Sequence, residues 1–323
     1  MRTQVLLRLR ALAIILALTW ASFVPQIKHV WQTKDSRGIS TAYLLFNLLC
    51  ITEHVFFHSL DIAYLWDVSK FPSAPVSVSP LDWVNLAQVL GDWVLSNVLF
   101  ALCLSYSPPT RPHRRLRTLL VLALYCFFLL FTLVPLILDL TTDVFCPPNH
   151  PHDCLLPERD VVPFLRGIHC YFLLPLTTVI LPVLGIFKQA MRIPPSHPPT
   201  PTTPTDLNGL LARSRLFQAA IFALSAILWI FRLPPGQQER EDDPPPPDAP
   251  LLPRPWLLVF LHWWMFMGYM TVDEAIFAIG QGVLGYLALR KAAEADGRSE
   301  GEEAERRPLL VAAEERSTYE SAS

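Results

Sequence analysis

The sequence predicts an all-α, polytopic membrane protein with seven transmembrane helices, and two observations carry this prediction. Of the 323 residues, 52% are hydrophobic and 17% are charged, whereas soluble domains carry about 25% charged residues. The charged residues also gather between long apolar stretches. Each stretch can cross a hydrocarbon core of ~30 Å as a helix, whose backbone polar groups are satisfied internally. This pattern excludes a water-soluble enzyme, a nucleic-acid-binding protein and a disordered scaffold.

Apolar blocks define the predicted spans at Leu9–Trp31, Ser40–Trp66, Trp83–Tyr106, Leu116–Leu140, Phe164–Phe187, Leu216–Leu233 and Trp256–Leu289. Tryptophan and tyrosine at several block ends suit the membrane interface. The last block has 34 residues, which would extend over ~51 Å as a helix. We therefore expect it to tilt, or to leave its tryptophan-rich start in the outer interface, with Trp256, Trp263 and Trp264.

The distribution of Lys and Arg predicts the orientation, because cytoplasmic loops are enriched in both. With the N-terminus outside, 17 of the 26 basic residues fall on inner segments. The exception is the N-terminus itself, with Arg2, Arg8 and Arg10. These arginines and the following apolar run also resemble a signal peptide over Met1–Phe23. Its cleavage would reverse the bias of the later loops, so we interpret the first block as a true span, with a luminal N-terminus and a cytosolic C-terminus.

Two of the six cysteines, Cys146 and Cys154, share a predicted outer loop in the string CPPNHPHDC. A disulfide between them suits an oxidising lumen. The alternative is a metal site that adds His150 and His152, but the spacing fits no zinc pattern. The four cysteines inside spans are interpreted as small apolar residues. We therefore expect neither a metal site nor a cofactor.

Carboxylates lie near the middle of three spans. Glu53 is at the midpoint of the second block, Asp92 is close to the midpoint of the third, and Asp273 is at the midpoint of the seventh, followed by Glu274. A charge at that depth costs roughly 2.5–3.5 kcal/mol, so three at matching depth predict a shared polar cavity. Protonation removes this charge, and a site that is charged in one state and neutral in another is what a proton-coupled carrier needs.

His54, His58 and Asp61 lie on the same side of the second predicted helix as Glu53, on a polar face about 140° wide. One interpretation is a proton relay or a substrate-lining surface. The other is a set of interhelical hydrogen bonds that only hold the bundle together. Metal binding by His54, His58 and Asp61 is a third, weaker alternative.

The segment from Ser22 to Ser40 reads SFVPQIKHVWQTKDSRGIS. Its Pro25-Gln26 pair near the inner end of a span, followed by a short basic loop with Ser, Gly and Ser, resembles the signature of PQ-loop repeat proteins. That family includes lysosomal and vacuolar amino-acid exporters such as cystinosin, and it is similar in architecture to the SWEET sugar transporters and to KDEL receptors. The resemblance therefore implies a membrane transporter rather than an enzyme.

The resemblance also implies two three-helix bundles joined by a linking helix. In this chain they correspond to a first bundle, the linking helix and a second bundle at residues 9–106, 116–140 and 164–289. A second motif is expected in the fifth span, where Pro182 occupies the place of Pro25 and Gln189 that of Gln32. Val183 replaces the glutamine of the pair, and the Ser-Gly-Ser tail is missing. We therefore expect the second bundle to be degenerate.

Pro25 has a physical consequence of its own. It lacks an amide N–H and clashes with the carbonyl four residues earlier, so it kinks the helix. The freed carbonyl and the Gln26 amide are tolerable in the membrane only beside a cavity. The kink is either a hinge that opens one side of a pathway or a static bend. We predict hinges at Pro25 and Pro182 and a pathway amide at Gln26.

Gly280, Gly282 and Gly285 match the spacing of a dinucleotide-binding fingerprint. They lie inside an apolar span, however, and not between a strand and a helix. Small residues that let two helices approach closely are the better interpretation.

The C-terminal tail, 290–323, is rich in Glu, Ala and Arg, and we expect it to be disordered or partly helical. Two proline-rich segments, 194–204 and 244–247, are expected to be extended connectors. Within the tail, Glu305-Arg-Arg-Pro-Leu309-Leu310 resembles an acidic dileucine sorting signal that cytosolic trafficking adaptors read. The alternative is an ordinary solvated, charged tail.

The leading hypothesis is a carrier of a vacuolar or lysosomal type of membrane. It moves a small polar solute, a cationic or zwitterionic amino acid, together with protons. The alternative is a non-transporting membrane receptor or trafficking adaptor of the same fold, which the degenerate second repeat and the long tail favour. An intramembrane enzyme that uses Glu53 with His54 or His58 is the third hypothesis, and it matches no known motif.

Overall fold

The computed structural model describes residues 2–36, 38–68, 78–107, 114–142, 161–192, 205–230, 263–264, 268–291 and 293–294. These residues include seven helices that are long and apolar enough to cross a membrane, and they contain no strand. The predicted all-α, seven-span fold is therefore confirmed, and the chain is an integral, multi-pass membrane protein. The predicted disulfide at Cys146 and Cys154 lies outside the described residues, as does the predicted sorting signal at Glu305, Leu309 and Leu310.

The first four spans are the helices α1 Arg2–Thr33, α2 Thr41–Val68, α3 Pro80–Ser105 and α4 Arg114–Thr141. The fifth span is built from consecutive helical segments, α5 Val161–Ile168, η2 His169–Leu173, η3 Leu176–Ile180 and α6 Leu181–Ala190. The sixth is α7, Thr205–Ile230. The seventh candidate span, called the last helix below, covers Tyr269–Lys291, 23 residues. The first residues of the predicted last block, 256–262, lie outside the described residues.

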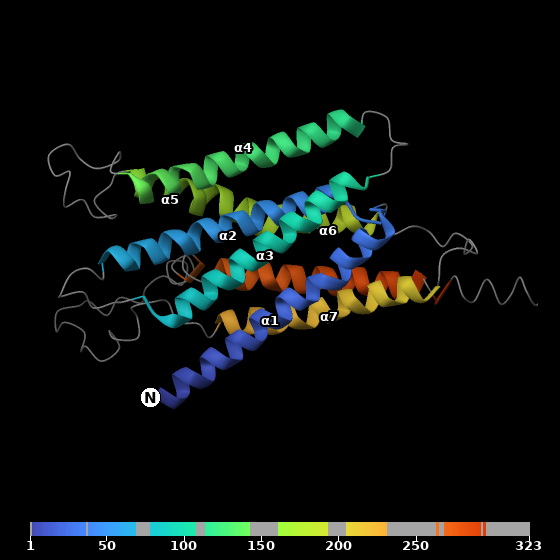
Figure 1. Ribbon diagram of the computed structural model, residues 1–323, viewed down its shortest axis with the longest axis horizontal. Coiled ribbons are helices and arrows are strands. Elements are labelled where there is room, and N and C mark those ends of the chain that lie inside the picture. The colour runs from blue at the N-terminus through green and yellow to red at the C-terminus, as the bar shows by residue number, and fades with distance from the viewer. Residues whose placement is uncertain are drawn as a thin grey trace, which may run out of the picture.

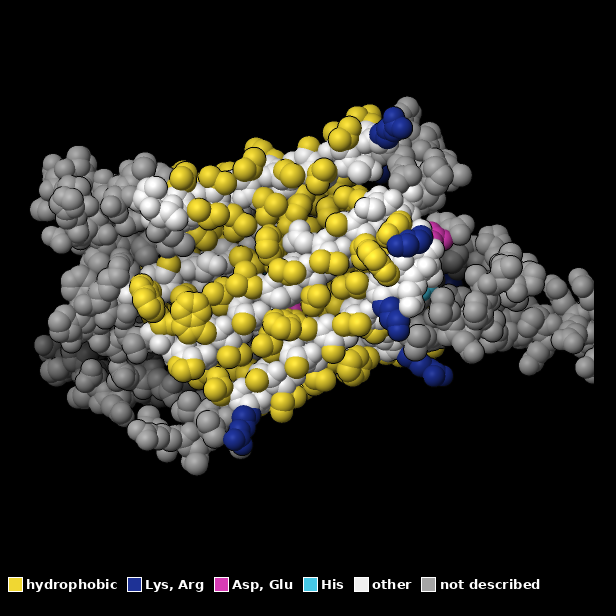
Figure 2. All heavy atoms as spheres, in the orientation of Figure 1, with side chains coloured by type: hydrophobic (Ala, Val, Ile, Leu, Met, Phe, Trp, Pro, Cys, Tyr) yellow, Lys and Arg dark blue, Asp and Glu magenta, His cyan; other side chains and the backbone are white. Residues whose placement is uncertain are grey.

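The helices pack around α2 and α3. Helix α3 contacts both α1 and α2, α2 also contacts α4 and α6, and α1 contacts α7 (Figure 1). In α2, 78% of the apolar window is buried inside the protein, whereas the figure for α4 is 17%. Helix α4 therefore lies at one edge of the bundle and presents leucine and phenylalanine side chains outward. Figure 2 shows hydrophobic side chains over the middle of one face, with Lys and Arg toward its ends.

The start of α3 follows from its local sequence. The Ser79 Oγ accepts a hydrogen bond from the Asp82 backbone N–H, and the Asp82 carboxylate accepts one from the Ser79 N–H. This reciprocal capping satisfies two of the N–H groups that a helix start leaves without partners. Pro80 occupies the first turn, where a missing N–H has no cost. Helix α3 is thereby held in register, with Asp92 about three turns further on.

The fifth span departs from regular α-helix. Residues His169–Leu173 and Leu176–Ile180 form two π-helical turns, and Pro175 lies between them. Proline cannot donate the usual backbone hydrogen bond, and π-helical turns of this kind are frequent at functional sites. They place His169, Thr177 and Thr178 on the buried side of the span.

The glycines of the last helix pack against its neighbours. A Cβ at Gly280 would meet Ile186 of α6 at 2.3 Å, and one at Gly285 would meet Leu216 of α7 at 3.0 Å. At Gly282, an added Cβ would meet the Ala219 Cβ at 3.8 Å, an ordinary contact. These glycines therefore lie at helix contacts within the membrane.

A comparison of two glycines tests this packing. At Gly91 an added Cβ would lie 2.1 Å from the Trp20 ring, on the contact between α3 and α1. Because overpacking costs about 1–3 kcal/mol and exceeds the gain of ~1 kcal/mol in helix propensity, we expect Gly91→Ala to destabilise the protein. Gly282→Ala is the matched control and is expected to be neutral or stabilising. Thermal unfolding in detergent measures both, and equal shifts for the two variants would contradict the packing described here.

Candidate functional site

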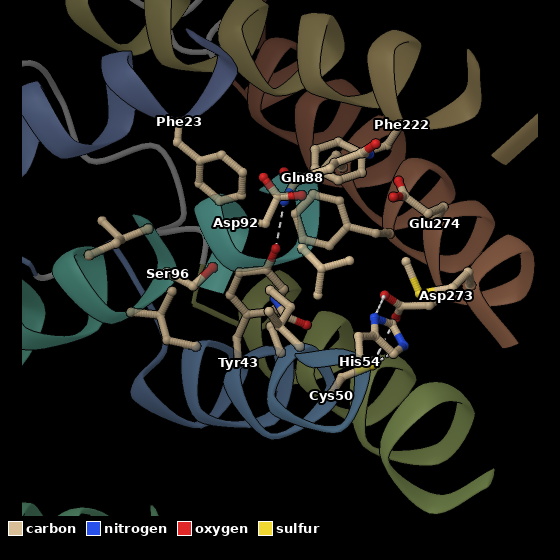
Figure 3. A pocket seen from close by; sticks show the side chains of 18 of the residues that line it. Phe23, Tyr43, Cys50, His54, Gln88, Asp92, Ser96, Phe222, Asp273 and Glu274 are labelled. Carbon is tan, nitrogen blue, oxygen red and sulfur yellow. Dashed lines mark hydrogen bonds and ion pairs between the residues drawn. The ribbon is translucent and has the colours of Figure 1, made fainter. Parts of the chain in front are cut away.

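A cavity lies between α1, α2, α3, α7 and the last helix (Figure 3). Asp92 of α3 and Asp273 and Glu274 of the last helix line it, and none of its described lining residues is a lysine or an arginine. Its volume is about 50 Å³. Since one water molecule needs ~10–15 Å³ of such space, this conformation has room for a few waters. The cavity is therefore small, polar and rich in acidic groups.

Three side chains meet closely at one side of the cavity. The Cys50 Sγ lies 3.2 Å from the Asp273 Oδ1 and 3.6 Å from the His54 Nε2. The other ring nitrogen of His54, Nδ1, lies 3.7 Å from the Asp273 Oδ2. Cys50 and His54 are one helical turn apart on α2 and share a face, while Asp273 comes from the last helix (Figure 3). A thiol, an imidazole and a carboxyl group thus converge.

Asp92 faces the same cavity from α3 (Figure 3). Its side chain is buried, and no hydrogen-bond donor among the described residues reaches its Oδ1. Because buried polar atoms nearly always have a partner, this oxygen is placed to meet water, a proton or a solute in the cavity.

Amide side chains join the helices around the cavity. The Gln26 Nε2 donates to the Gln218 Oε1 at 2.8 Å, and the Gln218 Nε2 donates to the Ser22 carbonyl at 3.1 Å. These two hydrogen bonds link α1 to α7 beside Pro25. Helix α1 continues past this proline. Elsewhere, the Gln281 Nε2 donates to the Tyr43 hydroxyl, across from the last helix to α2. The predicted pathway amide Gln26 therefore lines the cavity and also binds a neighbouring helix.

Glu53 does not line this cavity, so the shared pocket predicted for the three carboxylates contains only two of them, together with Glu274. The Glu53 Oε2 instead lies 2.8 Å from the His169 Nδ1, and both side chains are completely buried. The rings of Phe56 and Phe131 stack on His169 with centroid distances of 4.2 and 5.6 Å. Adjacent helix residues point about 100° apart, which is why Glu53 and His54 face different partners.

His169 was not identified from the sequence. A single histidine inside an apolar span gives no periodic signal, and its partner is 116 residues away. The only local sign is the presence of Pro175 and Pro182 in the fifth span, because prolines there accompany the π-helical turns that begin at His169.

The remaining residues of the predicted polar face of α2, His58 and Asp61, also contact different partners. The His58 Nδ1 lies 3.1 Å from the His54 carbonyl oxygen and 3.5 Å from the Tyr269 hydroxyl. Asp61 forms an ion pair with Arg166 of α5, with 3.5 Å between the Oδ1 and the Nη2. The face therefore serves three surroundings: the cavity, the sealed pair with His169 and a pair nearer the helix end.

The loop after α1 is fastened to the fifth span. The Gln189 Nε2 donates to the Gly38 carbonyl at 2.8 Å, and its Oε1 accepts a hydrogen bond from the Ser40 N–H at 2.7 Å. The Arg192 guanidinium donates to the Ile39 carbonyl at 3.1 Å. Pro182 is buried in the first turn of α6. The predicted second hinge thus lies about two turns before the residues that hold the loop.

The Glu53–His169 pair supports a stability prediction. Removing one member of a buried pair leaves the other without compensation, at about 3–5 kcal/mol, so we expect Glu53→Ala and His169→Ala each to lower the free energy of unfolding by that amount. A double variant, Glu53→Met with His169→Phe, should recover much of the loss because it leaves no polar group buried. Denaturation of the purified protein in detergent measures these changes.

Asp61→Ala is the control for that experiment. Its side chain and that of Arg166 are 32% and 28% exposed, and a pair of this kind contributes about 0–1 kcal/mol. A loss for Asp61→Ala as large as that for Glu53→Ala would contradict the special role of the sealed pair.

Comparison with known proteins adds one match. The family model for the PQ loop repeat matches residues 11–58, which hold the Pro25-Gln26 pair, the loop fastened by Gln189 and the α2 residues Cys50, Glu53 and His54. No match was found among curated proteins or among solved structures. The matched segment thus contributes α1 and the first half of α2 to the cavity. The predicted resemblance is confirmed over this segment: the chain is a seven-helix membrane protein that carries a PQ-loop repeat.

Proposed function

We propose that this protein is a PQ-loop-type transporter that moves a small polar solute through the cavity by proton-coupled alternating access. The observation that carries the proposal is the acidic cavity at mid-membrane, lined by Asp92, Asp273 and Glu274 and bordered by the helix that contains Pro25. Carboxyl groups at this depth are costly, and their convergence on one cavity is typical of a solute or proton pathway.

The lining favours a solute with a positively charged amino group. Three acidic side chains face the cavity without a lysine or arginine among its described lining residues, so the site attracts cations. Asn47, Gln88 and Ser96 add hydrogen-bonding groups. On one side, the rings of Phe23, Phe222 and Phe277 form an apolar wall, with Phe222 and Phe277 centroids 4.5 Å apart. A cationic or zwitterionic amino acid matches this combination.

The proposed coupling to protons follows from the net charge of the cavity. A cavity enclosed within the membrane tolerates little net charge, so its carboxyl groups need protons whenever no cationic solute is present. Exchange of a proton for the solute keeps the total charge of the cavity nearly constant. Asp92 and Asp273 are the proposed exchange sites, because both line the cavity.

Alternating access requires the helices to move, since a cavity of about 50 Å³ has to widen for an amino acid. Pro25 on α1 and Pro182 at the start of α6 are the proposed hinges. The hydrogen bonds from Gln189 and Arg192 hold the loop at 38–40 to the end of the fifth span. We propose that these bonds break when that end opens.

We propose a vacuolar or lysosomal type of membrane, with a luminal N-terminus and a cytosolic C-terminus. In this location the acidic lumen supplies protons. Trafficking adaptors that bind Glu305, Leu309 and Leu310 would direct the protein there.

Uptake by reconstituted vesicles tests the proposal. Vesicles that contain the wild-type protein and have an acidic interior should exchange a cationic or zwitterionic amino acid with the outside solution. The rate of this flux should depend on the pH difference across the membrane. Asp92→Asn and Asp273→Asn should each abolish the pH dependence, because an amide cannot exchange a proton. Glu294→Gln is the matched control, since Glu294 is exposed and pairs with Arg290 one turn away.

Two outcomes would contradict the proposal. Unchanged pH-driven flux in both aspartate variants would reject the coupling sites. Absence of flux across a panel of amino acids and sugars, with a folded wild-type protein, would favour the receptor or adaptor alternative.

A further inference from the structure

Three side chains at one side of the cavity could also bind a metal ion, which the transport proposal does not use: Cys50, His54 and Asp273. Their candidate ligand atoms, one from each residue, all lie within 4.8 Å of one another. Cys50 and His54 are 1% and 3% exposed, and the Asp273 side chain is 17% exposed. We propose that these three side chains form a binding site for a divalent transition metal ion of the Zn²⁺ type.

The separations suit such an ion. A tetrahedral Zn²⁺ bonded at ~2.3 Å to sulfur and ~2.0–2.1 Å to nitrogen or oxygen holds its ligand atoms about 3.3–3.6 Å apart. Here the sulfur lies 3.2 Å from the Asp273 oxygen and 3.6 Å from the His54 Nε2. The third separation, between the His54 and Asp273 ligand atoms, is at most 4.8 Å, so the three atoms are already grouped closely enough to surround one ion.

The ligand types select the metal. Thiolate and imidazole bind Zn²⁺ and related transition ions, whereas Mg²⁺ and Ca²⁺ prefer all-oxygen sites. One thiolate and one carboxylate also balance the two positive charges, so the complex is neutral in a region where net charge is costly. The metal takes the place of the Cys50 thiol proton and of any proton on Asp273, and these protons leave to water.

Neighbouring groups support the site. The Thr178 hydroxyl lies 3.9 Å from the Cys50 sulfur, where it can donate a hydrogen bond to a thiolate. The Tyr269 ring lies against the His54 ring, with centroids 5.4 Å apart, and limits its rotation. Contacts of this kind orient metal ligands. Because all three ligands line the cavity, the fourth coordination position faces the cavity and is open to water or a solute group, as in sites with three protein ligands.

The inference goes beyond the proposed transport function and is tested without flux. Purified full-length protein is titrated with Co²⁺, which reports thiolate coordination by a charge-transfer absorption band, and Zn²⁺ is then added as a competitor. The wild-type protein should develop the band at one equivalent, and Zn²⁺ should abolish it. Cys50→Ser should remove the band, and His54→Gln and Asp273→Asn should each weaken binding at least about tenfold.

Two matched controls locate the site. Cys103→Ser removes a buried cysteine of α3 that does not line the cavity, and it should leave the band unchanged. A double variant, Cys146→Ser with Cys154→Ser, removes the cysteines of the CPPNHPHDC string, and it should also retain the band. Elution as a single monodisperse species establishes that each variant is folded.

Three results would overturn the inference: no band in the wild-type protein, a band that persists in Cys50→Ser, or a band lost in the double variant. In the first case the three side chains form only an internal hydrogen-bonded cluster. Metal binding without amino-acid flux would reject the proposed transport function and leave this inference standing. Flux without metal binding would reject this inference alone.

Discussion

Lipid offers no hydrogen-bond partners, so every polar side chain in the middle of a span has to face protein or water. In this chain the constraint falls most heavily on α2, which carries an unusual set of polar side chains in an apolar helix: Cys50, Glu53, His54, His58 and Asp61. The helix is accordingly the most enclosed of the seven, with 78% of its window buried. Helix α4, whose mean hydropathy of 2.7 is the highest, lies at the edge.

Once α2 is central, its polar residues divide among three surroundings, and the two at mid-span are the closest together in the sequence. Glu53 turns toward the fifth span and pairs with His169 between stacked phenylalanine rings. His54, the next residue, turns toward the cavity and the last helix. The first centre is sealed and the second borders the cavity, although a single turn of one helix carries both.

Much of the fold could be predicted because hydropathy records each span separately. The positions of Glu53, Asp92 and Asp273 at mid-span were also visible in the sequence, as was the PQ-loop segment. The neighbours of each helix were not visible, because contacts such as Cys50 to Asp273 join residues 223 positions apart. The direction of Glu53 depends on a rotation of ~100° between adjacent residues, and a polar face about 140° wide did not resolve it. The start of the last predicted block, Trp256, lies outside the described residues, so its position stays a prediction.

The proposed function requires water to reach the cavity that Asp92, Asp273 and Glu274 line within the membrane. A single cysteine at Ser96, which lines the cavity from α3, tests this in a chain whose other cysteines are replaced by serine. A charged thiol reagent that cannot cross lipid should label Ser96→Cys, and an excess of a cationic amino acid such as lysine should reduce the labelling. Phe127→Cys is the control, because Phe127 is 67% exposed on the lipid-facing side of α4 and should resist the reagent. Labelling of Phe127→Cys but not of Ser96→Cys would contradict the claim.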